Sequence, residues 1–150
     1  VHLQSPTGTK QSHIIIMHHG RFYRFENILA KTPADMLEAF RFILNKTYSG
    51  EDFFPLGSMT HCKRPAWSKI REELVSDVTN ASSLEWIDSA LFTVSLMDTV
   101  VATEDSKDPS PELRSKSFNR WQDHGMNIVV FKEGRAGISF CHAMLSALLR

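Results

Sequence analysis

The chain has 150 residues, of which 42% are hydrophobic and 23% are charged, and this composition is typical of an ordinary globular domain. Its 17 lysines and arginines balance 17 aspartates and glutamates, so the net charge points to neither a nucleic-acid partner nor an anionic membrane surface. No apolar run approaches the roughly 20 residues that cross a bilayer. We therefore expect a folded domain with no transmembrane segment in these residues.

The cysteines and the two ends of the chain give little evidence of export. Cys62 and Cys141 form no C-x-x-C spacing, which argues against a zinc site, gives little support to a disulfide and fits a reducing compartment. Residues 1–13 lack the apolar core of a signal peptide and have too few arginines for a convincing transit peptide. Because the chain begins with valine and stops inside an apolar stretch, we expect it to be a piece of a longer protein.

The first elements along the chain are a hairpin and a helix. Two β-prone runs, 14–17 and 22–25, flank His18, His19 and Gly20, which predicts a β-hairpin. Neighbouring side chains on a strand point to opposite faces, so we interpret the two histidines as a hairpin tip and not as joint metal ligands. Thr32 before Pro33, followed by apolar residues at intervals of three and four, predicts an amphipathic helix over 33–46.

The central part of the chain predicts two further helices and a strand. A glycine- and proline-punctuated loop is expected over 48–63. A helix should begin near Pro65, with Trp67, Ile70, Leu74 and Val75 in one apolar stripe. Another should begin around Asn80, capped by Ser82 or Ser83, with Leu84, Ile87, Ala90 and Leu91 on its buried face. The run at 91–98 then has the β-branched and aromatic residues of a strand.

The last third predicts a polar loop over 103–119, a strand over 127–131, a turn at Glu133 and Gly134, a strand over 135–140 and the start of a further helix. Strands and helices interleave along the chain, and one hairpin ends the sequence of strands. We therefore predict the α/β class, with a mixed sheet flanked by helices and antiparallel pairs contributed by a hairpin.

Four strings, in order, resemble segments of the choline/carnitine acyltransferase family. They are "IIIMHHGRFYRF", "PLGSMTHCKRPAWSKIREEL", "NASSLEWIDSALFTVSLMD" and "NRWQDHGMNIVVFKEGRAGISFCHA", and they span residues 14–143. In the second string the family positions are matched by Gly57, Thr60, Arg64, Trp67, Arg71 and Leu74. The last string is the most specific, because it leads through a strand to a histidine that matches the family's active-site histidine.

The resemblance implies a fold and a reaction. Family members consist of two related halves, each like chloramphenicol acetyltransferase, and residues 1–150 correspond to part of the first half. The implied reaction is transfer of an acyl group between coenzyme A and carnitine, in a mitochondrion or peroxisome, with His142 as general base and no covalent acyl-enzyme. Coenzyme A is then a substrate; no bound cofactor and no metal are expected, and cofactor-binding residues remain unknown.

Departures from the family pattern leave alternatives open. Cys141 stands where the family has an acidic or amide residue, and Ser146 replaces an acidic residue four positions after the histidine. The motif that stabilises the oxyanion belongs to the later half, so we expect the isolated chain to be inactive. One alternative is a truncated, non-catalytic relative that binds a partner through an exposed half-domain surface. Another is choline in place of carnitine as acceptor.

Several other residues receive structural interpretations. Trp67, Trp86 and Trp121 are expected to anchor the core. His61 and Cys62 suggest a loop and not a ligand pair. Asp123 beside His124 imitates a catalytic pair, but Asp123 matches the family's structural W-x-D string. The basic residues between positions 63 and 71 are interpreted as a solvated helix face, namely Lys63, Arg64, Lys69 and Arg71.

Overall fold

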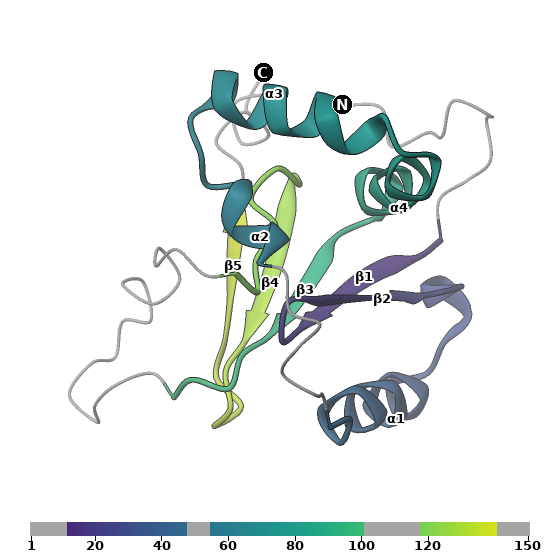
Figure 1. Cartoon of the computed structure of the whole chain (residues 1–150). Helices are drawn as coiled ribbons and strands as arrows, with labels where there is room; N and C mark the ends of the chain where they lie inside the picture. Colours follow the sequence, from purple (N-terminus) through teal and green to yellow (C-terminus); the bar gives the residue numbers. More distant parts are fainter. Residues whose placement is uncertain (1–11, 48–54, 101–117, 141–150) are drawn as a thin grey trace, which may run out of the picture.

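The computed structural model describes residues 12–47, 55–100 and 118–140. They form a five-stranded sheet in the order β2-β1-β3-β4-β5 (Figure 1). The three inner strands, β1 (Ile14–His18), β3 (Thr93–Leu96) and β4 (Met126–Val130), are parallel to one another. The edge strands, β2 (Arg21–Phe25) and β5 (Ala136–Phe140), pair antiparallel with β1 and β4. The predicted mixed α/β sheet is confirmed.

Helices cover both faces of this sheet. Figure 1 shows α1 (Pro33–Leu44) on one side, and α3 (Arg64–Val75) and α4 (Val78–Ser89) on the other. All five residues of β1 are buried, because alternate side chains of this inner strand pack against different layers. Ile14 and Ile16 pack with α1, whereas Ile15 and Met17 pack with α3 and α4.

The start of α1 follows from its first residues. A short 3₁₀ helix, η1 (Ile28–Ala30), precedes it, and the Thr32 side chain then caps α1 by accepting a hydrogen bond from the Asp35 N–H. The Asp35 carboxylate in turn accepts from the Thr32 N–H at 2.7 Å and from the Thr32 hydroxyl at 2.8 Å. These hydrogen bonds to Thr32 lower the pKa of Asp35 below its usual value. This capping box confirms Thr32 as the predicted start of the helix.

The two helices on the opposite face match the predicted apolar stripes, with three corrections. Leu91 was expected on the buried face of α4, but α4 ends at Ser89 and Leu91 packs against the cluster on the α1 face. Helix α4 begins at Val78 and is capped by Asp77, which accepts from the Thr79 and Asn80 N–H groups. The prediction of Ser82 or Ser83 as cap was wrong, since Asp77 places its carboxylate on two helix-start donors that a serine inside the helix cannot reach. Val75 was expected in the α3 stripe but is exposed at the C-terminal end of the helix.

The expected loop over 48–63 contains a short helix. Residues 48–54 lie outside the described residues, and α2 (Leu56–Met59) follows Pro55. Its four residues are too few to show helical periodicity in the sequence, which is why only the flanking glycine and proline signals were visible. This helix packs against residues 118–120, as described below.

Both hairpins are confirmed at the predicted places. His19 and Gly20, which connect β1 to β2, both have positive φ angles, 49° and 69°. Two such residues in succession are characteristic of the type I′ turn, whose twist matches that of the strands. Gly134 has φ 85° in the turn from β4 to β5. The expected helix after residue 143 and most of the expected loop 103–119 lie outside the described residues, among which no helix is long and apolar enough to span a bilayer.

Candidate active site

The predicted base, His142, lies outside the described residues, as do Cys141 and Ser146. The strand that leads to it is described. β5 ends at Phe140, which pairs with Met126 at the beginning of β4, and β4 is hydrogen-bonded on its other side to β3. The position of Phe140, the last described residue before His142, is therefore fixed by its pairing with β4.

Asn119 joins three parts of the chain next to these strands. Its side-chain Nδ2 donates to the Leu96 carbonyl at 2.7 Å and to the Met17 carbonyl at 3.3 Å, and its Oδ1 accepts from the Gly20 N–H at 3.1 Å. Leu96 and Met17 lie near the ends of two inner strands, and Gly20 lies in the first hairpin turn. One buried amide thus satisfies backbone groups from β1, β3 and the turn, which holds residue 119 against the sheet.

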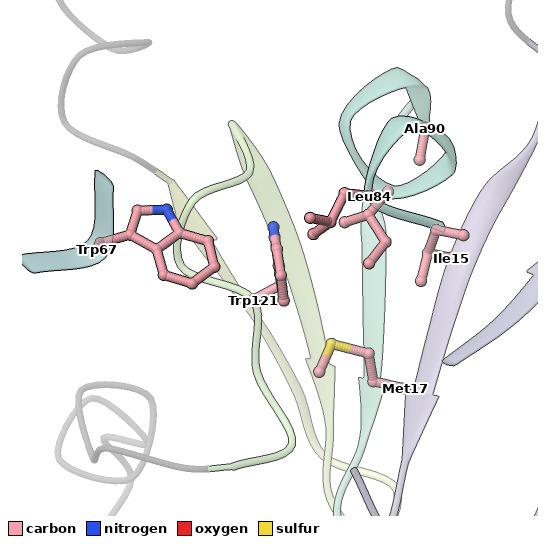
Figure 2. Packing of buried hydrophobic residues seen from close by; sticks show 7 residues of the cluster. Ile15, Met17, Trp67, Leu84, Ala90 and Trp121 are labelled. Carbon is pink, nitrogen blue, oxygen red and sulfur yellow. The ribbon is translucent and has the colours of Figure 1, made fainter. Parts of the chain in front are cut away.

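Trp121 fills the core between the sheet and α3. Its side chain is fully buried, and its ring meets those of Trp67 and Phe22 edge-to-face at centroid distances of 5.5 and 5.6 Å. Figure 2 shows Trp121 between Trp67 on one side and Met17 and Leu84 on the other. Trp67 and Trp121 are confirmed as core anchors. Trp86 is not, since it is exposed and stacks under the Arg24 guanidinium at 4.8 Å.

Gly57 and Thr60 form the surface against which the segment containing Trp121 packs. A Cβ atom on Gly57 would collide with the backbone carbonyl oxygens of Phe118 and Arg120, so this position requires glycine. The Thr60 hydroxyl donates to the Gly57 carbonyl at 2.7 Å and accepts from the Gln122 N–H at 2.9 Å. Gly57 and Thr60, which match the family in the string at residues 55–74, therefore contact the family-like string that begins at Asn119.

Asp123 connects the same two strings through its carboxylate. It accepts from Trp67 Nε1 at 2.6 Å and from Arg64 at 3.0 Å, and Arg71 lies 3.9 Å away. Arg71 also pairs with Asp88 of α4. The interpretation of a solvated basic face is confirmed for Arg64, whose side chain is 79% exposed, and was wrong for Arg71, which is 28% exposed and lies between the carboxylates of Asp88 and Asp123.

Asp123 and His124 do not form a catalytic pair with each other. Asp123 turns toward Trp67, whereas the two ring nitrogens of His124 lie 2.9 Å from the Ala90 carbonyl oxygen and 3.3 Å from the Met126 carbonyl oxygen. The structural interpretation of Asp123 is confirmed by its bond to the Trp67 indole. Next to them, Arg120 is fully buried, and this burial lowers the pKa of its guanidinium from its usual value.

A cavity of about 680 Å³ lies at the opposite edge of the sheet from β5. It is lined by residues of β1, β2, α2, α3 and α4 and by the two residues 46–47 that follow α1, with Arg21, Arg24 and Lys46 as its charged residues. Among the described residues that line it, none belongs to β4 or β5. This cavity is therefore separate from the described end of β5 at Phe140.

Comparison with known proteins identifies the family to which the chain belongs. The model of the "Choline/Carnitine o-acyltransferase" family matches residues 2–149, which is nearly the whole chain. The chain belongs to the choline/carnitine acyltransferase family. The predicted resemblance, carried by the strings that meet around Trp67 and Trp121, is confirmed.

Relatives within the choline/carnitine acyltransferase family include enzymes of different named specificity. Carnitine O-palmitoyltransferase 2, mitochondrial, of Macaca fascicularis is 30% identical over 144 residues, which cover 91% of this chain and 21% of that protein. The corresponding Mus musculus protein is 31% identical, with the same coverage. Peroxisomal carnitine O-octanoyltransferase of Rattus norvegicus is 30% identical over 155 residues, 95% of this chain and 24% of that protein. The chain thus spans about a fifth to a quarter of the length of these relatives.

Sequence reasoning missed the residues that hold the family strings together. Asn119 was part of a quoted string, but nothing local indicates that its amide joins β1, β3 and the first turn. The surface at Gly57 was likewise invisible, since the segment that packs against it begins 61 residues later. A glycine and an asparagine that are both matched to one family were the only available signal.

Proposed function

We propose that these residues provide the general base, His142, and part of the first-half sheet of an enzyme that transfers acyl groups between coenzyme A and carnitine. The observation that carries the proposal is the family match over residues 2–149, which includes position 142. The contacts of Trp121 and Asp123 with Trp67, and of Gly57 with residues 118–120, support it, because they join the second family-like string to the fourth.

The proposed reaction needs one base that works in both directions. His142 accepts the proton of the carnitine hydroxyl while the oxygen attacks the carbonyl carbon of the acyl thioester. The carbon–sulfur bond then breaks, and the imidazolium returns the proton to the coenzyme A sulfur, which yields acylcarnitine and free thiol. Imidazole suits this role because its unperturbed pKa, about 6.5, leaves it largely neutral near pH 7. No electron acceptor and no covalent enzyme intermediate are needed.

The proposed substrates are acyl-coenzyme A and carnitine, and the proposed location is a mitochondrion or peroxisome, as in the names of the relatives. We infer that the 150 residues alone are inactive, since catalysis requires the acyl carbonyl, the alcohol and the oxyanion donors to be positioned around the base. Purified chain mixed with octanoyl-coenzyme A and carnitine should release no thiol above background. Carnitine-dependent release of coenzyme A by this chain would contradict the inference.

The role of His142 is tested in a chimera. Residues 2–149 replace the matched segment of the rat peroxisomal carnitine octanoyltransferase, and His142→Ala is compared with His61→Gln, which removes a histidine far from β5 along the chain. Loss of a general base lowers kcat by about 10²- to 10⁴-fold, whereas H61Q should stay within about twofold. Circular dichroism and thermal melting establish that each protein is folded. A folded H142A chimera that retains its activity would eliminate His142 as the base.

The two departures beside the histidine can be tested in the same chimera. If Ser146 weakens the site by removing a charge, Ser146→Asp should raise kcat, and Cys141→Glu should have a separate effect. A folded chimera that is inactive until S146D is introduced would mean that the scaffold is competent and that this substitution costs activity. Replacement of carnitine by choline in the assay decides between the two acceptors.

A second candidate function is binding without catalysis. Ile138 and Phe140 are two residues apart on the edge strand β5, so their side chains lie on the same face. They are 54% and 45% exposed. Exposed apolar residues of this kind mark association surfaces. Sedimentation velocity of the purified chain between about 1 and 100 μM tests this candidate: association that Ile138→Lys abolishes would favour it, and a monomer throughout would not.

A further inference from the structure

The hairpin tip and the end of the third strand bring together three side chains that bind metals in other proteins. One ligand atom each from His18, His19 and Asp98 lies within 4.8 Å of the others. His19 Nε2 is 3.0 Å from Asp98 Oδ2, and the two imidazole rings are 4.3 Å apart at their centroids. We propose that these residues form a Zn²⁺ site at this corner of the sheet.

The turn geometry explains why two adjacent histidines share one side. His18 is the last residue of β1, but His19 lies beyond the strand and has a positive φ of 49°. The alternation of side chains applies only within a strand, so the expectation of opposite faces does not extend to His19. The left-handed turn brings its ring to that of His18, edge to face.

The surroundings of the first ligand hold it in one orientation. The His18 side chain is buried, and its Nδ1 lies 3.2 Å from the carbonyl oxygen of Leu96. A carbonyl oxygen can only accept a hydrogen bond, so Nδ1 carries the hydrogen and the lone pair of the neutral ring is on Nε2. Metal-binding histidines are oriented in the same way, by a hydrogen bond from the second nitrogen to a carbonyl or carboxylate.

The other two ligands are accessible and adjustable. The His19 and Asp98 side chains are 47% and 58% exposed, so an ion reaches them from solvent. Tetrahedral bonds of about 2.0–2.1 Å require ligand atoms about 3.3 Å apart. The His19–Asp98 separation already agrees with this value, and rotation of these two exposed side chains closes the remaining gap to His18.

The ligand chemistry selects the ion. Two imidazole nitrogens and one carboxylate oxygen suit Zn²⁺, whereas Ca²⁺ and Mg²⁺ prefer sites made entirely of oxygen. Three protein ligands leave a fourth position for water. An ion here would link the β1–β2 turn to the residues that follow β3, and this proposal is independent of the proposed acyl transfer.

Calorimetric titration of the tag-free 150-residue chain with ZnCl₂ tests the site. We expect saturable binding of one Zn²⁺ that His19→Asn and Asp98→Asn each weaken at least tenfold. Asparagine tolerates the positive φ of position 19, and both residues are exposed, so neither substitution should disturb the fold. The matched control, His61→Gln, removes a histidine next to Cys62 and should change the affinity less than twofold.

Circular dichroism and thermal melting without zinc establish that the variants fold. Zinc should raise the melting temperature of the unmodified chain and of H61Q, and should raise that of folded H19N or D98N much less. The proposal is overturned if the unmodified chain shows no saturable binding. It is also overturned if H19N and D98N, both folded, bind zinc as tightly as the unmodified chain.

Discussion

The face of the sheet covered by α1 and the face covered by α3 and α4 are built from different kinds of side chain, although the same strands supply both. The buried cluster on the α1 face is entirely aliphatic and consists of Ile14, Ile16, Ile43, Val94 and Leu96. The opposite face has two tryptophans at its centre, and polar side chains tie its loops to the strands. The residues that match the family are concentrated on this second face.

The two faces differ in how strongly they restrict the residues that each position tolerates. An aliphatic cluster requires apolar residues of about the right volume, so conservative exchanges cost little there. A buried polar network requires each donor and acceptor to keep its partner, and removal of one member leaves others unsatisfied. We therefore expect substitutions on the α3 and α4 face to be more damaging than exchanges of similar size on the α1 face.

The largest effect is expected for Gly57→Ala. The added Cβ would collide with two backbone carbonyls, those of Phe118 and Arg120, and neither can rotate away as a side chain would. Overpacking of this kind destabilises by about 3 kcal/mol or more, even though alanine is the better helix former. Urea denaturation measures the change.

Gly134→Ala is the matched control for this glycine. No atom lies within 4 Å of a Cβ at Gly134, so only its positive φ opposes alanine, at a cost of about 1 kcal/mol. A G57A protein as stable as G134A would mean that α2 does not seat the segment that carries Trp121.

The next effect is expected for Asp123→Ala. This substitution removes the acceptor of the Trp67 indole N–H and the carboxylate next to Arg64 and Arg71, so it should cost about 2 kcal/mol. Asp88→Ala removes the other carboxylate that pairs with Arg71, at a more exposed position, and should cost less than about 1 kcal/mol. Equal losses of unfolding free energy in D123A and D88A would contradict the central place of Asp123 in the network.

Strand β1 and the start of α1 were predictable from the sequence because their causes are local. The run of apolar residues in β1, the spacing in α1 and the Thr32–Pro33 pair each act within one turn or strand. The first hairpin was likewise predicted from a glycine between β-prone runs, whereas its turn type follows from the positive φ angles of His19 and Gly20. The α4 cap was predicted wrongly, because the helix was expected to begin near Asn80 with a serine as cap, whereas it begins at Val78 with Asp77 as cap.

The contacts that define the second face were not predictable, because their partners are distant in the sequence. Trp67 and Asp123 are 56 residues apart, and Asn119 and Met17 are 102 apart. The Asp98 carboxylate beside His19 depends on the parallel pairing of β1 with β3, which no local pattern specifies. For the candidate base, the sequence supplies a family position, and His142 stays a prediction.

Of the three principal substitutions, Ile16→Val in the buried aliphatic cluster should have the smallest effect. Removal of one buried methylene should cost about 1 kcal/mol, since the α1 cluster loses packing but no polar group loses its partner. The indole N–H resonances of Trp67 and Trp121 should stay in place in nitrogen–proton spectra of I16V, whereas D123A should move that of Trp67. A large indole shift in I16V would show that the two faces are coupled through β1, and that the aliphatic layer also positions the family residues.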